Sequence, residues 1–397
     1  MRPLPSLNVD VLSHVLAYFE KSEDVSSFML ACRAFYGLSI PYFLDPKREG
    51  VKLDNEKDAL LFINFMSAAS HSSRRFSSLS DLRITINFHR QSEDFTNPDN
   101  TEVIGRQLAE IIRRSINLER LSFNDSILDL DDREIVKVFK SNLKSHKRLK
   151  NLRMSVNGES GCQLLEEIEA PPVADLWISF SYNIIMGPEV ILPFASTVTS
   201  LSIHLPSMEG LRDVCCPHVR ELTLSTSDNI VTSDLLKAFP RIQDFTLEDI
   251  CDGPALPLPV NDTRALARRA NNQSLLARDK ITTLKLRYAK GPPTWMYMMG
   301  LLPEVREVDL SDDVGCDECR LTRPIQVVRD CSPKAVRIEI RGEAQHTAQE
   351  IKDMLQELSE ILKASGTTHL YITFKLTGQA LLASMASNFL VYTYHPV

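Results

Sequence analysis

One short apolar pattern returns along most of the chain and constrains its fold more than any other feature. From Leu79 onward the order is apolar, two residues, apolar, one residue, apolar, as in LERLSF at Leu118. The last two apolar residues of each copy alternate with polar ones, which is the period of a half-buried strand. Copies begin at Leu79, Leu118, Leu149, Val173, Val198, Val219, Ile242, Ile281 and Val305, and weaker ones contain Ile338 and Ile340, then Leu370 and Ile372.

The spacing of these copies predicts a repeated strand–helix unit. Their second apolar positions lie 21 to 39 residues apart, at Leu121, Leu152, Leu176, Leu201, Leu222, Phe245, Leu284 and Val308. The shorter steps agree with a leucine-rich-repeat period of about 20–29 residues, and the longer steps need insertions. Helical patterns such as EVIGRQLAEIIRRSI, REIVKVFKSNL, CQLLEEIEA, SDLLKAF and AQEIKDMLQELSEIL lie between the strands. The predicted fold class is therefore α/β, with a parallel sheet backed by helices.

The region from about Leu79 to Phe374 resembles a leucine-rich-repeat domain. The asparagine that the family places three residues after the last core leucine is kept only at Asn157. We therefore expect an irregular solenoid that mostly lacks the family's side-chain ladder. An ordinary α/β domain with similar strands remains the alternative.

The stretch from Leu7 to Phe43 predicts a small helical unit. It holds two closely spaced amphipathic segments, which are too short to bury their own apolar surface without a partner. The apolar side chains of the first segment are Val11, Leu12, Val15, Leu16 and Phe19, and those of the second are Val25, Phe28, Met29, Cys32 and Phe35 or Tyr36. We expect Pro41 to end the second segment.

This stretch resembles an F-box. The family's Leu-Pro-x-(Glu/Asp)-(Ile/Val)-Leu opening aligns with Leu7 to Leu12, with Asn8 in place of proline. The resemblance implies binding to a Skp-type adaptor and, through it, to the cullin of a ubiquitin ligase. The adaptor-binding residues that it implies are Leu7, Val11, Leu12, Val15, Leu16, Val25, Phe28, Met29, Cys32 and Phe35.

A second interpretation is that these helices only cap the first repeat, because terminal caps are required in solenoids. The helix expected from Asn55 to Ala69, with Ala59, Phe62, Ile63 and Met66 at helical spacing, is a better candidate for that cap. The predicted domains are thus a helical F-box-like module at 1–45, a helical linker or cap at 46–78 and a leucine-rich-repeat-like domain at 79–397.

The strand alternation also predicts where a substrate binds. Residues that flank or separate the core leucines point to the open face of the sheet, which solenoids commonly use for partners. We expect the substrate-binding residues to be Arg153, Trp177, His204, Lys285, Arg287, Asp309, Arg341 and Tyr371, with Arg120 and Glu248 also outward. Trp177, Lys285, Arg287 and a loop insertion from Cys251 to Gln273 are predicted to favour an acidic or phosphorylated partner.

Charge and motifs argue against other functions. The formal net charge is −7, whereas nucleic-acid binding needs a basic surface. No phosphate-cradling, metalloprotease or serine-hydrolase motif occurs, and the Cys316–Cys319 pair lacks a second pair that would complete a zinc site. We therefore expect no enzymatic activity, cofactor or metal. The eight cysteines are scattered, and the sequence shows no apolar leader. The charge-free stretch from Leu376 to Tyr394 is not expected to span a membrane. These features favour the cytoplasm or nucleus.

Charge is uneven near the insertion. From Arg264 to Lys290, eight basic residues accompany Asp279 alone, and the next repeat is mostly acidic. These charges either pair with each other or bind a partner. The function that follows from the resemblance is substrate recognition in a ubiquitin ligase, and the alternative is a repeat-based scaffold without a ligase.

Overall fold

The computed structural model divides into two compact units, Met1–Ile184 and Ile185–Val397. The boundary falls inside the predicted repeat region, and the domain limits predicted near residues 45 and 78 stay predictions. The residues that the structure describes are 9–19, 22–31, 33–44, 50–68, 71–88, 100–127, 139, 141, 143–168, 171–181, 186–205, 207–226, 229–248, 263–281, 286–301, 305–310, 322–343, 356, 359–360, 362–364 and 366–377.

Three short helices open the first unit: α1 (Val9–Ala17), α2 (Ser22–Ala31) and α3 (Arg33–Phe43). Aromatic rings join them, because Phe28 stacks on Phe35 at 4.3 Å between ring centroids and meets Phe19 edge-on at 5.7 Å. The second predicted segment is thus divided into α2 and α3. Pro41 does not end it, since α3 includes Pro41 and continues to Phe43.

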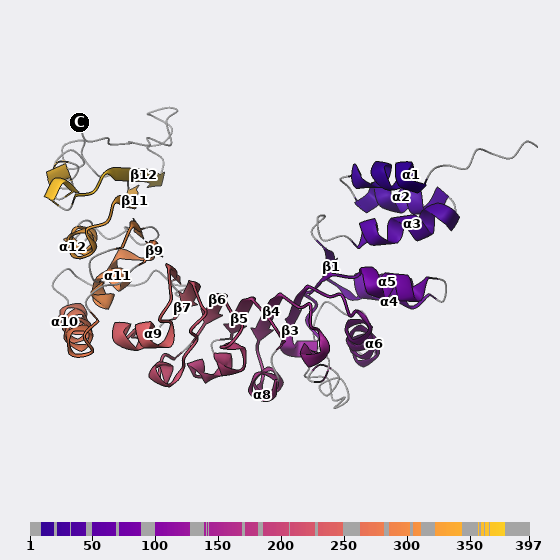
Figure 1. Cartoon of the computed structure of the whole chain (residues 1–397), viewed down its shortest axis with the longest axis horizontal. Helices are drawn as coiled ribbons and strands as arrows, with labels where there is room; N and C mark the ends of the chain where they lie inside the picture. Colours follow the sequence, from indigo (N-terminus) through magenta and orange to yellow (C-terminus); the bar gives the residue numbers. More distant parts are fainter. Residues whose placement is uncertain are drawn as a thin grey trace, which may run out of the picture. The chain divides into compact units, whose positions relative to one another are not determined.

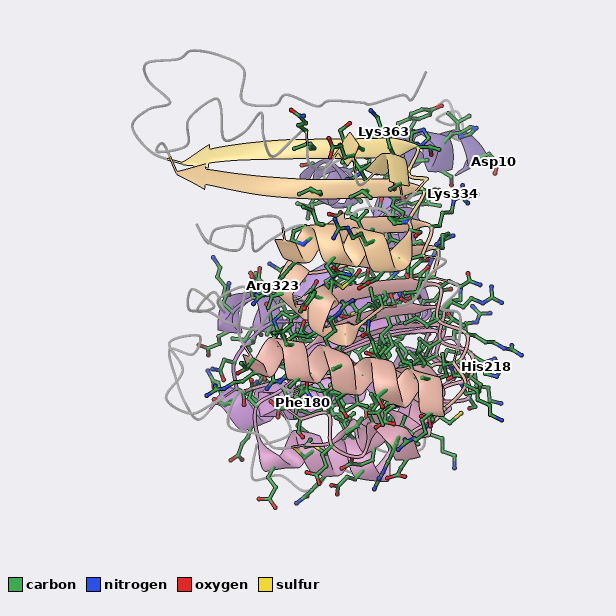
Figure 2. All side chains as sticks on the ribbon, turned by 90° about the vertical axis from the view of Figure 1, so that its left-hand side faces the viewer. Asp10, Phe180, His218, Arg323, Lys334 and Lys363 are labelled. Atoms are coloured by element: carbon green, nitrogen blue, oxygen red, sulfur yellow. The ribbon has the colours of Figure 1, made fainter. Side chains whose placement is uncertain are left out.

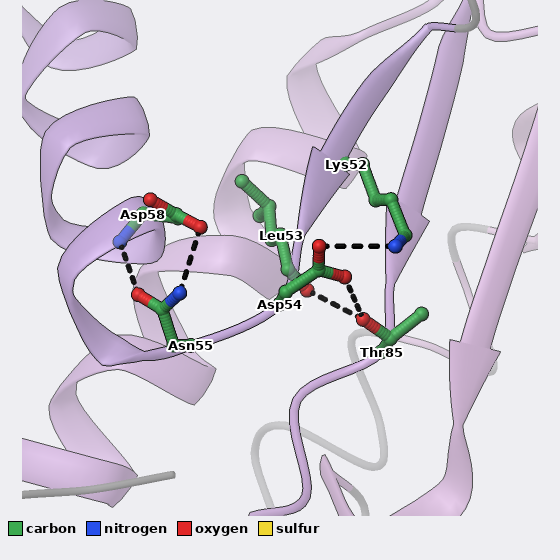
Figure 3. Close-up of polar contacts among 6 residues, drawn as sticks. All are labelled: Lys52, Leu53, Asp54, Asn55, Asp58 and Thr85. Carbon is green, nitrogen blue, oxygen red and sulfur yellow. Dashed lines mark hydrogen bonds and ion pairs between the residues drawn. The ribbon is translucent and has the colours of Figure 1, made fainter.

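Two further helices follow, α4 (Glu56–Ser67) and α5 (Ser72–Ser78). The side chain of Asn55 caps α4 by accepting a hydrogen bond from the amide of Asp58 at 3.0 Å, as Figure 3 shows. Just before this cap, the Thr85 hydroxyl donates to the carbonyl of Leu53 at 3.1 Å and contacts Asp54 at 2.5 Å. The four apolar residues predicted for this helix, Ala59, Phe62, Ile63 and Met66, are all buried.

The sheet of the first unit is parallel, and its strands follow chain order. Corresponding leucines pair across it, so that Leu121 lies opposite both Leu82 and Leu152. Figure 1 shows α6 (Asn100–Arg114) and α8 (Glu159–Glu167) on one side of these strands. The strands are β1 (Val51–Leu53), β2 (Asp81–Ile84), β3 (Arg120–Asn124), β4 (Asn151–Val156) and β5 (Asp175–Phe180).

The second unit repeats the same arrangement. Its parallel strands are β6 (Ser200–His204), β7 (Glu221–Ser225), β8 (Asp244–Glu248), β9 (Tyr288–Lys290), β10 (Glu307–Leu310), β11 (Ala335–Glu343) and β12 (His369–Thr377). Figure 1 shows its helices on one side of the strands, and Figure 2 shows β11 and β12 as two long adjacent strands. The helices are α9 (Thr232–Ala238), α10 (Thr263–Arg278), α11 (Pro293–Met299) and α12 (Thr322–Cys331), with 3-10 turns η3 (Pro188–Phe194) and η4 (Leu211–Asp213).

The core of each unit lies between strands and helices. The inward strand residues form buried rows: Leu82, Leu121, Leu152 and Leu176 in the first unit, and Leu201, Leu222, Phe245, Ala289, Val308, Val336 and Leu370 in the second. Because every row is apolar, the sheet can be buried on this side without unpaired polar side chains. The predicted parallel sheet backed by helices is confirmed within each unit.

Three further details of the prediction differ in the structure. The segment predicted as a helical linker or cap at 46–78 also contains β1. The strand predicted around Leu284 lies later in the sequence. In the structure Phe245 pairs with Ala289, and the first apolar position of this copy of the pattern is Leu286. The insertion expected as a loop contains the first part of α10, the longest helix of the described residues; residues 251–262 lie outside them. Much of REIVKVFKSNL and AQEIKDMLQELSEIL also lies outside the described residues.

The expected loss of the asparagine ladder has a local substitute in the first unit. The carboxylate of Asp125, in the turn η2 (Asp125–Ile127), accepts hydrogen bonds from the amides of Asn157 and Gly158 at 2.7 and 2.8 Å. Asn157 in turn donates to the side chain of Asn124 at 2.9 Å. A buried carboxylate therefore organises the turn that follows β4.

Candidate functional site

A hollow lies on the strand face of the first unit, the surface made by the outward side chains of β2 to β5. It measures about 190 Å³. We call it the arginine hollow, and its lining residues are Asp81, Arg83, Arg120, Leu121, Ser122, Asn151 and Arg153.

Strand register brings these side chains together. Arg83, Ser122 and Arg153 hold equivalent positions on β2, β3 and β4. Asp81 and Arg120 are equivalent in the neighbouring row, which continues to Asn151. Because adjacent strands are about 4.8 Å apart, long arginine side chains from three strands reach one point above the sheet.

Asp81 is the acidic group of the hollow, and its side chain is buried. Its carboxylate lies 3.5 Å from Nη1 of Arg120 and 3.6 Å from Nη2 of Arg83. Both distances exceed those of strong charge-assisted hydrogen bonds, which are about 2.7–2.9 Å. Since a guanidinium group has five N–H donors, most donors of both arginines remain free of Asp81.

The other polar groups of the hollow add donors rather than acidic partners. Among the described residues, no carboxylate forms an ion pair with Arg153, which is exposed. The amide nitrogen of Asn151 donates to Asp175 at 2.6 Å, so this outer carboxylate is already engaged. With three arginines facing one buried aspartate, the arrangement can hold an anion.

Sequence reasoning found part of this hollow. Arg120 and Arg153 were predicted to point outward, whereas Arg83 and Ser122 were missed. The same alternation identifies both, because Arg83 stands between Leu82 and Ile84, and Ser122 between Leu121 and Phe123.

Trp177 continues the row of Arg83, Ser122 and Arg153 onto β5. It is half-buried rather than fully exposed, with the inward Leu176 and Ile178 beside it in sequence completely buried. The predicted orientation of Trp177 toward the strand face therefore agrees with the register. Its remaining exposed area is available for contact beside Arg153.

The strand face of the second unit is organised differently. Asp309, predicted to be open to a substrate, is buried; it accepts a hydrogen bond from the Tyr288 hydroxyl at 3.1 Å and lies 3.8 Å from Arg337. Burial and the adjacent Asp309 raise the pKa of Tyr288. Arg337 also lies over the ring of Tyr371, 5.8 Å from its centroid. These side chains are engaged with each other, which leaves less charge for a partner.

The remaining predicted substrate residues are spread over the chain. Arg287 is exposed but bound to Asp244, with Nε 2.8 Å from the carboxylate. His204 is half-buried, and burial lowers its pKa. Lys285 and the side chain of Arg341 lie outside the described residues. Trp177 belongs to the first unit and Arg287 to the second.

Part of the uneven charge near α10 is paired within the second unit. Arg269 forms an ion pair with Asp330, and Lys237 pairs with Asp279 at 2.7 Å. These acidic partners lie outside the acidic stretch of the next repeat, so the predicted pairing between the two stretches stays a prediction. The acidic positions 311–320 lie outside the described residues.

The predicted adaptor-binding residues divide into two groups. Leu12, Leu16, Val25 and Met29 are buried, and Phe28 and Phe35 are half-buried against each other. Leu7 and Cys32 lie outside the described residues. Large apolar side chains that stay exposed are Val11 (54%), Val15 (40%), Tyr18 (80%) and Leu30 (82%). Sequence reasoning missed Tyr18 and Leu30, because each lies off the stripe expected to be apolar.

In the described part of the chain, no cluster of three His, Cys, Asp or Glu side chains could hold a metal ion, and no helix has the length and hydropathy to cross a membrane. Cys162, Cys215, Cys216 and Cys331 are free thiols, and burial raises the pKa of Cys216 to about 12. Cys316, Cys319 and nearly all of the charge-free stretch after Leu376 lie outside the described residues.

Comparisons with known proteins give little further information. No family model and no curated protein matches the sequence. Among solved structures, the chain is similar to the leucine-rich repeat-containing protein LegL7 from Legionella pneumophila. The TM-score is 0.37 at 10% sequence identity, covering 77% of this chain and 88% of that chain. The repeat architecture described above therefore rests on strand order and register in this chain.

Proposed function

We propose that the chain is the substrate-recognition subunit of a Skp–cullin–F-box ubiquitin ligase. In this proposal α1 to α3 bind a Skp-type adaptor, and the strand face of the repeats binds a protein substrate. The observation that carries it is the apolar surface left on α1 and the turn that follows it, where Val11, Val15 and Tyr18 are exposed.

These three residues are spaced at i, i+4 and i+7, which places them along one side of a helix. The adjacent residues Leu12 and Leu16 are buried within the first unit. α1 therefore has a broad apolar surface, and only part of it is covered by its own chain. A short helix of this kind is favoured to bind an apolar partner surface, because burial of that surface from water is favourable.

The alternative function is a repeat-based scaffold whose N-terminal helices are only a cap. One contact favours it: Arg75 of α5 is buried and donates hydrogen bonds to the Tyr36 hydroxyl at 2.9 Å and to the carbonyl of Ala68 at 2.7 Å. This contact attaches α3 firmly to the following helices. A cap needs such an attachment, but it does not need the exposed Val11, Val15 and Tyr18.

The proposal assigns no catalysis and no cofactor to this chain, because ubiquitin transfer in such ligases belongs to other subunits. It also places the protein in the cytoplasm or nucleus, where the adaptor would be met. The substrate remains a protein of unknown identity, bound without participation of nucleic acid or membrane.

The test is co-purification of an adaptor and a cullin with the full-length chain carrying an affinity tag. Val15→Asp and Leu30→Asp each place a charge on the exposed apolar surface without entering the core. We expect each to reduce adaptor capture at least tenfold, because an unpaired charge in an apolar interface must lose its water.

Ile116→Asp is the matched control, since Ile116 is an equally exposed apolar residue of the same unit outside α1 to α3. It should leave adaptor capture within twofold of the wild type. Equal capture by all variants would argue against the F-box surface. Absence of adaptor and cullin from the wild-type sample would favour the scaffold.

A further inference from the structure

We propose that the arginine hollow binds the phosphate of a phosphorylated serine or threonine in the protein substrate. This inference rests on the proposed function, because it names the substrate class for the strand face of the first unit. It replaces the recognition surface expected from Trp177, Lys285 and Arg287, whose members belong to two units.

The charge of the hollow fits a phosphate group. Three arginines and one aspartate line it, which gives a net charge of +2. A phosphorylated side chain carries about −1.5 to −2 charges at pH 7 and three strong acceptor oxygens. A carboxylate carries one charge and two oxygens, so it would use fewer of the donors that three adjacent strands supply.

The geometry of the donors is also suitable. Arg83, Arg120 and Arg153 come from three neighbouring strands whose register is fixed by the sheet. The hydroxyl of Ser122 stands between Arg83 and Arg153 in the same row, and no described side chain forms a hydrogen bond with it. Planar guanidinium groups bind phosphate with two parallel hydrogen bonds, which makes arginine the side chain of choice for this ligand.

Asp81 lowers the net positive charge of the hollow. Its buried carboxylate lies between Arg83 and Arg120 and offsets part of their charge. The contact distances of 3.5 and 3.6 Å leave both guanidinium groups able to turn toward a stronger acceptor. Arg153 has no such carboxylate among the described residues and is the arginine most available to the phosphate.

The position of Trp177 predicts a second feature of the bound peptide segment. It lies in the same row as Ser122, two strands further along the sheet. Two strand spacings correspond to roughly 10 Å, and an extended peptide rises about 3.3 Å per residue. A segment that crosses the strands would therefore place an apolar side chain on Trp177 about three residues from its phosphorylated residue.

The test uses the full-length chain and an oriented peptide library with one fixed phosphoserine and variable flanking positions. The same library with unmodified serine, inorganic phosphate and a single-stranded RNA are the comparison probes. We expect selective capture of phosphopeptides, enrichment of apolar residues about three positions from the phosphoserine, and at least tenfold weaker binding by Arg153→Gln and Arg120→Gln.

Arg148→Gln is the matched control, because Arg148 is an exposed arginine of the same unit that does not line the hollow. It should change phosphopeptide affinity less than twofold. Thermal unfolding and adaptor capture are measured for every variant, so that a misfolded protein is recognised. Arg83→Gln is a further variant of the hollow and should weaken binding by a similar factor.

Equal capture of both libraries, or tighter arginine-dependent binding of the RNA, would overturn the proposal. So would phosphopeptide binding that none of the three hollow variants weakens. These outcomes are separate from the proposed function, since a chain that captures the adaptor but not phosphopeptides keeps its ligase role and loses only this substrate class.

Discussion

Arg75 and Tyr36 are joined by a hydrogen bond of 2.9 Å, although they are 39 residues apart and lie on different helices. The Arg75 guanidinium carbon also lies 4.8 Å from the ring centroid of Phe65 and 5.5 Å from that of Tyr36. A fully buried arginine thus connects α3, α4 and α5 of the first unit. The attachment of the N-terminal helices to the repeats depends on this one side chain more than on any other described polar contact.

Replacement of this arginine should destabilise the first unit. Arg75→Met removes both hydrogen bonds and leaves the Ala68 carbonyl and the Tyr36 hydroxyl without their donor. We expect the free energy of unfolding to fall by about 2–3 kcal/mol, measured by urea denaturation. Arg74→Met is the control, because Arg74 is exposed and adjacent in sequence, and it should change stability by less than about 0.5 kcal/mol. Similar values for both variants would show that the buried contacts contribute little.

Two features require glycine at position 50: its backbone conformation and its close contact with a neighbouring side chain. Its φ is +74°, and a Cβ built there would lie 2.5 Å from Cγ of Asp81, the buried acid of the arginine hollow. Gly50→Ala should therefore lower the free energy of unfolding by about 2–4 kcal/mol, since it adds steric overlap to backbone strain. It should also weaken phosphopeptide binding by displacing Asp81 and the arginines that contact it.

Gly366 provides a control that separates these two effects. Its φ is +72°, but no atom lies within 4 Å of the position of an added Cβ. Gly366→Ala should lower the free energy of unfolding by about 1 kcal/mol, which is the cost of the backbone strain alone. If calorimetry gives equal losses for the two alanine variants, then the contact between Gly50 and Asp81 does not matter.

Asn272 shows a polar side chain that supports the core of the second unit. It is buried on α10, where its amide nitrogen donates to the carbonyls of Ile230 and Met298 at 3.0 and 2.9 Å. Its amide oxygen accepts from the backbone of Thr232 at 3.2 Å. Asn272→Ala should reduce the free energy of unfolding by about 2–4 kcal/mol, because three buried backbone groups lose their partner.

The control for this change is Asn271→Ala, one residue earlier on the same helix and exposed. Its effect should lie within about 0.5 kcal/mol of zero, since alanine also has the higher helix propensity. A comparable loss of stability in both variants would mean that α10 itself, rather than the contacts of Asn272, limits stability.

Much of the fold was predictable because strand alternation is a local property. The pattern around Leu121, Leu152 and Leu222 identified strands whose inward residues are buried in register. The prediction failed where the residues at the core positions are small. Ala289 takes the place of a leucine in β9, and Gly291 follows where a Cβ would approach that of Leu247 to 3.0 Å. Close packing of neighbouring strands excludes large residues there, so the apolar pattern is lost.

The candidate site was less predictable, because it depends on which outward side chains find partners. Asp309 occupies an outward strand position, yet Tyr288 and Arg337 engage it and it is buried. Arg153 occupies an equivalent kind of position and has no acidic partner among the described residues. Alternation predicts the direction of a side chain, whereas its neighbours across strands depend on register. The insertion was misread for a similar reason, since its prolines concealed the helix that begins at Thr263.

His146 should make stability depend on pH. Its side chain is buried, and burial lowers its pKa below the usual 6.5, although a contact with the backbone of Ile112 opposes the shift. The folded chain therefore holds this imidazole neutral at pH values where the unfolded chain, with a pKa of about 6.5, binds a proton.

The direction of the effect follows from this proton balance. Below about pH 6.5 the unfolded state gains a proton that the folded state does not, so the free energy of unfolding falls as pH decreases. The decrease continues until the lowered folded pKa is reached, with a slope of at most about 1.4 kcal/mol per pH unit from this group. His146→Phe, which cannot titrate, should lose less stability than the wild type in urea denaturation between about pH 6.5 and 5. A parallel decline in the wild type and His146→Phe would show that other groups cause the acid sensitivity.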